Sequence, residues 1–144
     1  MSRFKLQSDR EHERAIKKKA RDELPPIPAN ATWMLVFGLD GDVNCKHNAH
    51  RFEAAIAGTG KPFVLAGPDI VYDAGDIPVI IAFGGQDIAK FWLKETKAKT
   101  ATVPLVIVRS NASGYGVTSQ GMHDAERIHE LFERARELQR EAMS

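Results

Sequence analysis

The stretch WMLVFGLDGDVN, residues 33–44, carries the strongest fold signal in the chain. Its first five residues form a continuous apolar run, which predicts a strand buried on both faces. The following GLDGDVN, residues 38–44, is rich in turn-forming residues and should end that strand. Since helices cover the faces of such strands, this stretch predicts an α/β fold.

Further elements are expected on both sides of this strand. Apolar runs predict strands at 63–65, 70–72, 77–83 and 103–109. Helical spacing and capping residues predict helices at 8–24, 48–58, 86–96 and 122–142, the second of them capped by Asn48. The Gly/Ser-rich residues 110–121 are interpreted as a loop. We therefore predict a single-domain mixed sheet of about five strands covered by helices, in the order αβαβββαβα.

Proline positions divide the chain into three parts. Residues 1–24 form a basic N-terminal helix, and Pro25, Pro26 and Pro28 place a connector at 25–32. Residues 33–144 form the α/β core with its C-terminal helix. A chain of 144 residues is the usual size of one domain.

Composition indicates a soluble globular protein of a reducing compartment. Apolar residues make up 43% and charged residues 27%, which excludes a disordered chain. Cys45 is the single cysteine, so no internal disulfide is possible. The first 14 residues lack the apolar run of a signal peptide, and no apolar run has the length of a membrane helix. We expect a cytoplasmic protein with no membrane partner.

The basic residues are concentrated at the N-terminus. Residues 1–24 contain eight Lys/Arg and five Asp/Glu, although the whole chain has a net charge of only +1. Such an excess suits nucleic acid or an acidic partner, and the alternative is a solvated helix face. The candidate nucleic-acid-binding residues are Arg14, Lys17, Lys18, Lys19 and Arg21.

Carboxylates follow the first buried strand. Asp40 and Asp42, with Asn44, offer oxygen ligands for a divalent metal at a strand end. The run VFGLDGDV, residues 36–43, resembles the strand and turn of haloacid-dehalogenase-type phosphatases. In that resemblance Gly38 stands where those enzymes have their nucleophilic Asp. An ordinary Asp/Gly turn is the alternative.

Cys45, His47 and His50 are candidate zinc ligands, because thiolates and imidazoles bind zinc and the two histidines share a helix face. A closed site needs a fourth ligand from His123, His129 or Asp40. The alternative is a polar helix start that contains a free thiol.

A third candidate site includes Glu53 and Asp69. The helix with Glu53, the Pro68-Asp69 pair, and the strand, helix and strand that follow resemble the PD-(D/E)xK nuclease superfamily over some 60 residues. The resemblance implies that Glu53 and Asp69 hold Mg²⁺. Where the family has Glu-x-Lys at a strand end, this chain has residues 82–84 (AFG), and its one match, residues 95–97 (ETK), falls at a helix end. The resemblance therefore implies a degenerate site.

The predicted loop 110–121 contains five hydroxyl side chains: Ser110, Ser113, Tyr115, Thr118 and Ser119. It has no Gly-x-Ser-x-Gly elbow and no evident His–acid pair nearby, so we do not expect serine-hydrolase chemistry.

Together these features favour a non-catalytic, nucleic-acid-associated protein with a degenerate nuclease-like core. One alternative is a small regulatory protein, an inhibitor or adaptor, that binds another protein through its terminal helices. Another is a divalent-metal-dependent hydrolase that uses Asp40, Asp42, Asp69 and Glu53. We expect no cofactor in the first two cases and a divalent metal in the third. The C-terminal helix could also form a homodimer.

Overall fold

The apolar run at the start of the core forms β1, Thr32–Leu39, the central strand of a five-stranded sheet. Every residue of β1 except Leu39 is buried, as expected for a strand covered on both faces. The computed structural model describes the chain except for residues 1–10, 19–30, 58–69, 75–76, 115 and 144.

The sheet is mixed, with the strand order β2-β3-β1-β4-β5. β1 pairs in parallel with β3, and all other neighbouring strands are antiparallel. The strands that flank β1 are β2 (Ile70–Ala74), β3 (Ile77–Gly84), β4 (Leu105–Ser110) and β5 (Gly116–Gln120).

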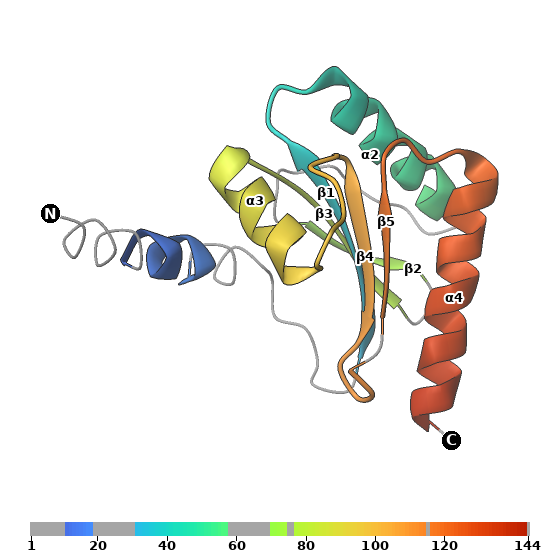
Figure 1. Ribbon diagram of the computed structural model, residues 1–144. Helices are drawn as coiled ribbons and strands as arrows, with labels where there is room; N and C mark the ends of the chain where they lie inside the picture. Colours follow the sequence, from blue (N-terminus) through green and yellow to red (C-terminus); the bar gives the residue numbers. More distant parts are fainter. Residues whose placement is uncertain (1–10, 19–30, 58–69, 75–76, 115, 144) are drawn as a thin grey trace, which may run out of the picture.

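Helices cover both faces of the sheet (Figure 1). α2 (Val43–Ala57) and α4 (Ala125–Met143) lie on one face, and α3 (Gln86–Glu95) lies on the other, beside a helix at residues 11–18. Successive β1 side chains alternate between these layers because a strand has a period of two. Met34 and Val36 join the core with α2 and α4, whereas Leu35 and Phe37 join the core with α3.

None of the helices in the described part of the chain has both the length and the apolar character needed to cross a membrane.

The mixed α/β class is confirmed, but the predicted element order is not matched. Predicted strands 33–37, 70–72, 77–83 and 103–109 correspond to β1, β2, β3 and β4. The loop prediction for 110–121 is wrong in part, because residues 116–120 form β5. The predicted strand 63–65 lies outside the described residues, as does most of the connector 25–32.

The prediction that α2 begins at Asn48 is also wrong. α2 begins at Val43, and the Asp42 carboxylate accepts a hydrogen bond from the Cys45 backbone N–H at 2.9 Å. That bond is typical of an N-cap residue. Asn48 is fully buried inside the helix instead.

Candidate functional site

The turn after β1, which contains Asp40 and Asp42, has a structural role at the start of α2. Asp40 is exposed, and Asp42 caps α2. Gly38 lies where α2 packs closely on β1, since a Cβ there would be 2.8 Å from Cys45 Cβ and 2.9 Å from Phe83 Cε1. An aspartate nucleophile at position 38 would therefore not fit without movement of its neighbours.

The candidate zinc ligands point to different sides of α2. Cys45 is buried, and burial raises the pKa of its thiol. His47 and His50 are exposed, and His50 Nδ1 lies 3.2 Å from Oε2 of the buried Glu53. Among the residues that the structure describes, no three His, Cys, Asp or Glu side chains are grouped as metal ligands.

The acids of the nuclease resemblance are only partly placed. Glu53 is 7% exposed, and its Oε1 has no hydrogen-bond partner within the described ranges. Asp69 lies outside the described residues, so the joint role of Glu53 and Asp69 stays a prediction. Residues 82–84 end β3, and the alternative Glu95-Thr96-Lys97 spans the end of α3.

A buried polar network that the sequence analysis did not predict joins α2, β5 and the segment before α4. His123 is 1% exposed, and its Nδ1 lies 3.0 Å from Asn48 Oδ1. Its backbone N–H donates to the same oxygen at 3.0 Å. On the other side of the ring, His123 Nε2 lies 2.9 Å from Ser119 Oγ. The expectation that no His–acid pair lies near the serines of the 110–121 segment is not contradicted, because the side chain that holds His123 is an amide, Asn48.

The hydrogen bonds of the network determine which ring nitrogen of His123 carries the hydrogen. Because Asn48 Oδ1 is only an acceptor, the hydrogen lies on His123 Nδ1, and Nε2 accepts a hydrogen bond from the Ser119 hydroxyl. Burial, with a smaller contribution from the charge of Arg127, lowers the pKa of His123 from 6.5 to about 4, while Asp124 acts in the opposite direction. The ring is therefore neutral at pH 7.

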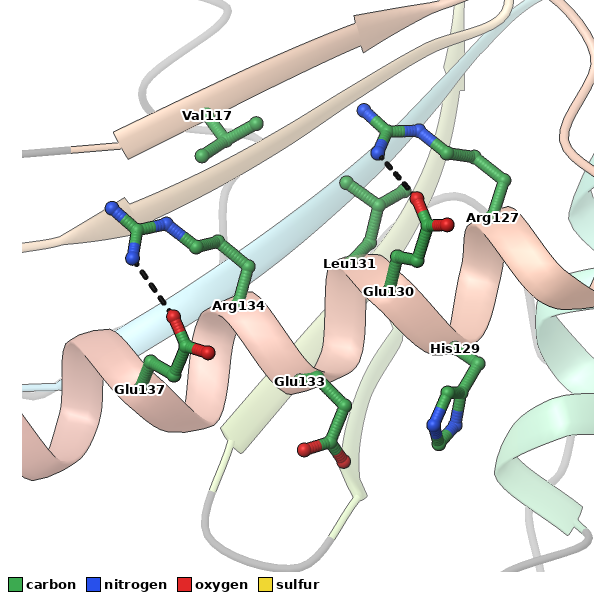
Figure 2. A pocket seen from close by; sticks show the side chains of 8 residues that line it. All are labelled: Val117, Arg127, His129, Glu130, Leu131, Glu133, Arg134 and Glu137. Carbon is green, nitrogen blue, oxygen red and sulfur yellow. Dashed lines mark hydrogen bonds and ion pairs between the residues drawn. The ribbon is translucent and has the colours of Figure 1, made fainter.

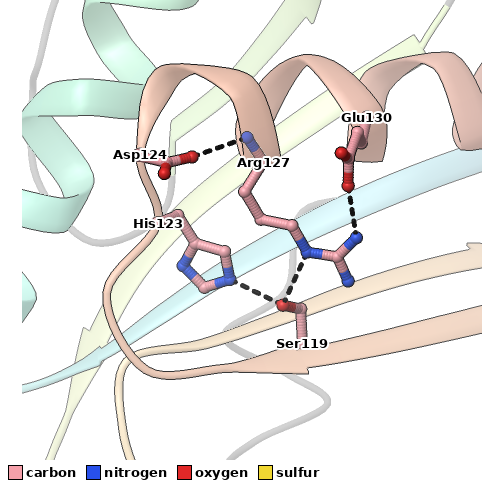
Figure 3. Close-up of polar contacts among 5 residues, drawn as sticks. All are labelled: Ser119, His123, Asp124, Arg127 and Glu130. Carbon is pink, nitrogen blue, oxygen red and sulfur yellow. Dashed lines mark hydrogen bonds and ion pairs between the residues drawn. The ribbon is translucent and has the colours of Figure 1, made fainter.

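Arg127 connects this network to the surface of α4 (Figure 3). Its Nε is 3.4 Å from Ser119 Oγ, and its guanidinium pairs with Glu130 at 3.0 Å. Its backbone N–H donates to the Asp124 carboxylate at 2.8 Å, which caps α4.

A groove of about 430 Å³, whose lining includes Arg127, lies along α4 (Figure 2). We call it the α4–β5 groove, because Val117 of β5 and residues of α4 line it. Leu131 and Val117 supply its apolar floor, and Arg127 and Arg134 extend over it beside their partners Glu130 and Glu137. Its remaining lining residues are His129 and Glu133.

A separate surface on the opposite side of the sheet is basic. The helix at 11–18 contacts the α3 layer, since Ile16 packs against the apolar cluster around Trp92 and His12 Nε2 lies 3.8 Å from Asp87 Oδ2. The resulting surface, which we call the basic face, contains seven exposed cationic side chains: Arg14, Lys17, Lys18, Lys90, Lys94, Lys97 and Lys99.

Only part of the basic face was expected from the sequence. Arg14, Lys17 and Lys18 are exposed on helix 11–18, whereas Lys19 and Arg21 lie outside the described residues. The four lysines of α3 and the segment after it were missed. These lysines could have been identified from the sequence, because they recur at 90, 94, 97 and 99 on the polar side of an amphipathic helix and just beyond it.

Comparison with protein-family models and with curated proteins gives no match to this chain.

Proposed function

We propose that this protein binds nucleic acid through the basic face and carries out no chemistry on the bound strand. The observation that carries the proposal is the contact between helix 11–18 and the α3 layer, through Ile16 and the His12–Asp87 pair. This contact joins three cationic side chains of the helix to four lysines of the α3 region. The same elements contain four acidic residues: Glu11, Glu13, Asp87 and Glu95.

The lysines of the basic face differ from the arginines of α4 in their partners. Arg127, Arg134 and Arg136 of α4 each pair with a glutamate at 3.0 Å or less. Within the described ranges, Lys90 and Lys94 form no ion pair. Cations without protein partners can neutralise phosphates directly, and the counterions that they release favour binding.

An aromatic side chain lies among these lysines. Phe91 is only half-buried, and it packs edge-on against Trp92 with ring centroids 5.0 Å apart. Partly exposed aromatic rings beside cations are a common feature of surfaces that bind single strands, where bases stack on them. This feature favours single-stranded RNA or DNA over a duplex.

The test is fluorescence anisotropy with labelled 20-nucleotide RNA, single-stranded DNA and duplex DNA over a range of salt concentrations. Each phosphate contact should contribute about −0.9 (duplex) or −0.7 (single strand) to the slope of log K against log salt. The double variant Lys90→Glu, Lys94→Glu should therefore bind about tenfold or more weakly and show a shallower slope by roughly one to two.

The matched control reverses two exposed charges on the opposite face, Lys46→Glu and Arg140→Glu. It changes the net charge by the same amount, so it should leave binding nearly unchanged if the basic face is the site. Equal losses in the two variants, or no salt-dependent binding by the wild type, would refute the proposal. A protein partner at the terminal helices, a homodimer through α4 and a metal-dependent hydrolase stay predictions.

A further inference from the structure

Ser119, His123 and Asn48 are arranged as a nucleophile, a base and a residue that orients the base. Ser119 Oγ is 2.9 Å from His123 Nε2, and His123 Nδ1 is 3.0 Å from Asn48 Oδ1. A hydroxyl within hydrogen-bond distance of a base, with the base held by a third group, is the geometry of an activated nucleophile. The three residues come from β5, the segment before α4, and α2, so tertiary structure creates the arrangement.

The Ser119 hydroxyl is linked to the α4–β5 groove through Arg127, although Ser119 itself does not line the groove. Val117 and Ser119 are two residues apart on β5, so their side chains face the same side of the sheet. Val117 lines the groove, and Arg127, which also lines it, reaches Ser119 Oγ with its Nε. Ser119 is half-buried, whereas His123 is 1% exposed. Because Asn48 is also fully buried, the serine is the most exposed member of the set.

We propose that Ser119 is a nucleophile activated by His123, and that the α4–β5 groove accepts carboxylic esters with a small apolar acyl group. The activity is separate from nucleic-acid binding at the basic face and does not depend on it. The apolar floor formed by Val117 and Leu131 would hold the acyl chain. The Arg127 guanidinium would lie near the carbonyl oxygen.

In the first step Ser119 Oγ bonds to the ester carbonyl carbon, and the hydroxyl proton moves to His123 Nε2. The bond from that carbon to the leaving alkoxide then breaks, and the alkoxide takes the proton from Nε2. In the second step water attacks the acyl-serine, again gives its proton to Nε2, and releases the carboxylic acid as Ser119 recovers its hydrogen. Arg127 stabilises the negative charge on the carbonyl oxygen in both steps.

Asn48, the residue that orients His123, determines the expected rate of ester hydrolysis. Asn48 holds the ring in the productive tautomer but cannot neutralise the imidazolium that forms during the reaction, so the base is weak and turnover is slow. Asn48 Nδ2 also lacks a hydrogen-bond partner among the described residues. An aspartate at this position would remove that unpaired donor and stabilise the imidazolium.

The experiment combines two readouts on the full chain. A fluorophosphonate probe, followed by peptide mass spectrometry, should label Ser119, and p-nitrophenyl butyrate should be hydrolysed above the buffer rate. Ser119→Ala should abolish both signals, and His123→Gln should reduce both at least tenfold. Ser113→Ala, at a serine in the turn of the same hairpin, is the matched control and should retain both.

Asn48→Asp tests the positioning role. It should raise the hydrolysis rate at pH 7 at least tenfold and move the acidic limb of the pH–rate profile to higher pH, because the carboxylate raises the pKa of His123. Tm is measured for each variant, so a loss through unfolding is recognised. Failure to label Ser119 in both the wild type and folded Asn48→Asp, or labelling that persists in Ser119→Ala, would overturn the proposal.

Discussion

Acidification should destabilise the fold through one residue, His123. Its pKa falls from 6.5 to about 4 on folding, so the unfolded chain binds more protons than the folded chain between these pH values. The free energy of unfolding therefore decreases as the pH falls from 6.5 to about 4, and this residue causes no further loss at lower pH. At 1.36 kcal/mol per pKa unit, the loss is about 3 kcal/mol.

The structure explains why protonation is costly. The ring is buried, and the positive charge of Arg127 lies close to it. A second ring hydrogen would also face Ser119 Oγ, which would have to turn its own hydrogen away. The negative charge of Asp124 raises the pKa of His123, but this effect is smaller than the effects of burial and Arg127 that lower it.

Urea denaturation at pH 7, 5.5 and 4 would measure the effect. Carboxylates also titrate in this range, so the variant His123→Gln, which keeps polar groups but does not titrate, supplies the baseline. The wild type should lose about 3 kcal/mol more than the variant on going from neutral pH to about pH 4. Parallel pH curves, or a His123 ring signal in NMR that titrates near pH 6.5, would refute the reasoning.

Three substitutions test the packing by urea denaturation. Asp42→Ala should cost about 1 kcal/mol through loss of the α2 cap, and an unchanged midpoint would contradict that role. Gly38→Ala should cost about 1–3 kcal/mol because its Cβ would meet Cys45 and Phe83 within 3 Å, and a neutral result would mean that α2 moves freely. Phe52→Ala should cost about 3–5 kcal/mol because the ring is fully buried between α2 and α4, and a cost below 1 kcal/mol would show that the site collapses around the cavity.

Local sequence pattern was sufficient for the central strands and for α3 and α4. β1, β3 and β4 are continuous apolar runs because both faces are covered, and such runs are visible in any window. β5 gave no such signal. As an edge strand with only half-buried or exposed residues it needs few apolar side chains, and the serine and glycine residues of its segment are typical of loops.

Neither the start of α2 nor the polar network could be predicted from local sequence, and the two failures have different reasons. Asp42 and Asn48 are both good N-cap residues, and the sequence between them does not decide which one is used. His123 and Asn48 are 75 positions apart, so their contact depends on how α2 and α4 pack on one face of the sheet. The Cys–His group looked like a ligand set because its members are close in sequence, yet neighbouring positions on a helix point in different directions. The two carboxylates lie in the turn before α2, where Asp42 is the cap of that helix.

The central position of β1 has a consequence for synthesis on the ribosome. Its two neighbours come later in the chain, and the second of them ends at Ser110, 71 residues after Leu39. At about 5–20 residues per second, this central strand is made roughly 4–14 s before both of its edges can be paired. During that interval the nascent chain should expose an apolar segment with unpaired backbone groups, which favours aggregation, so slowed elongation should lower the soluble yield.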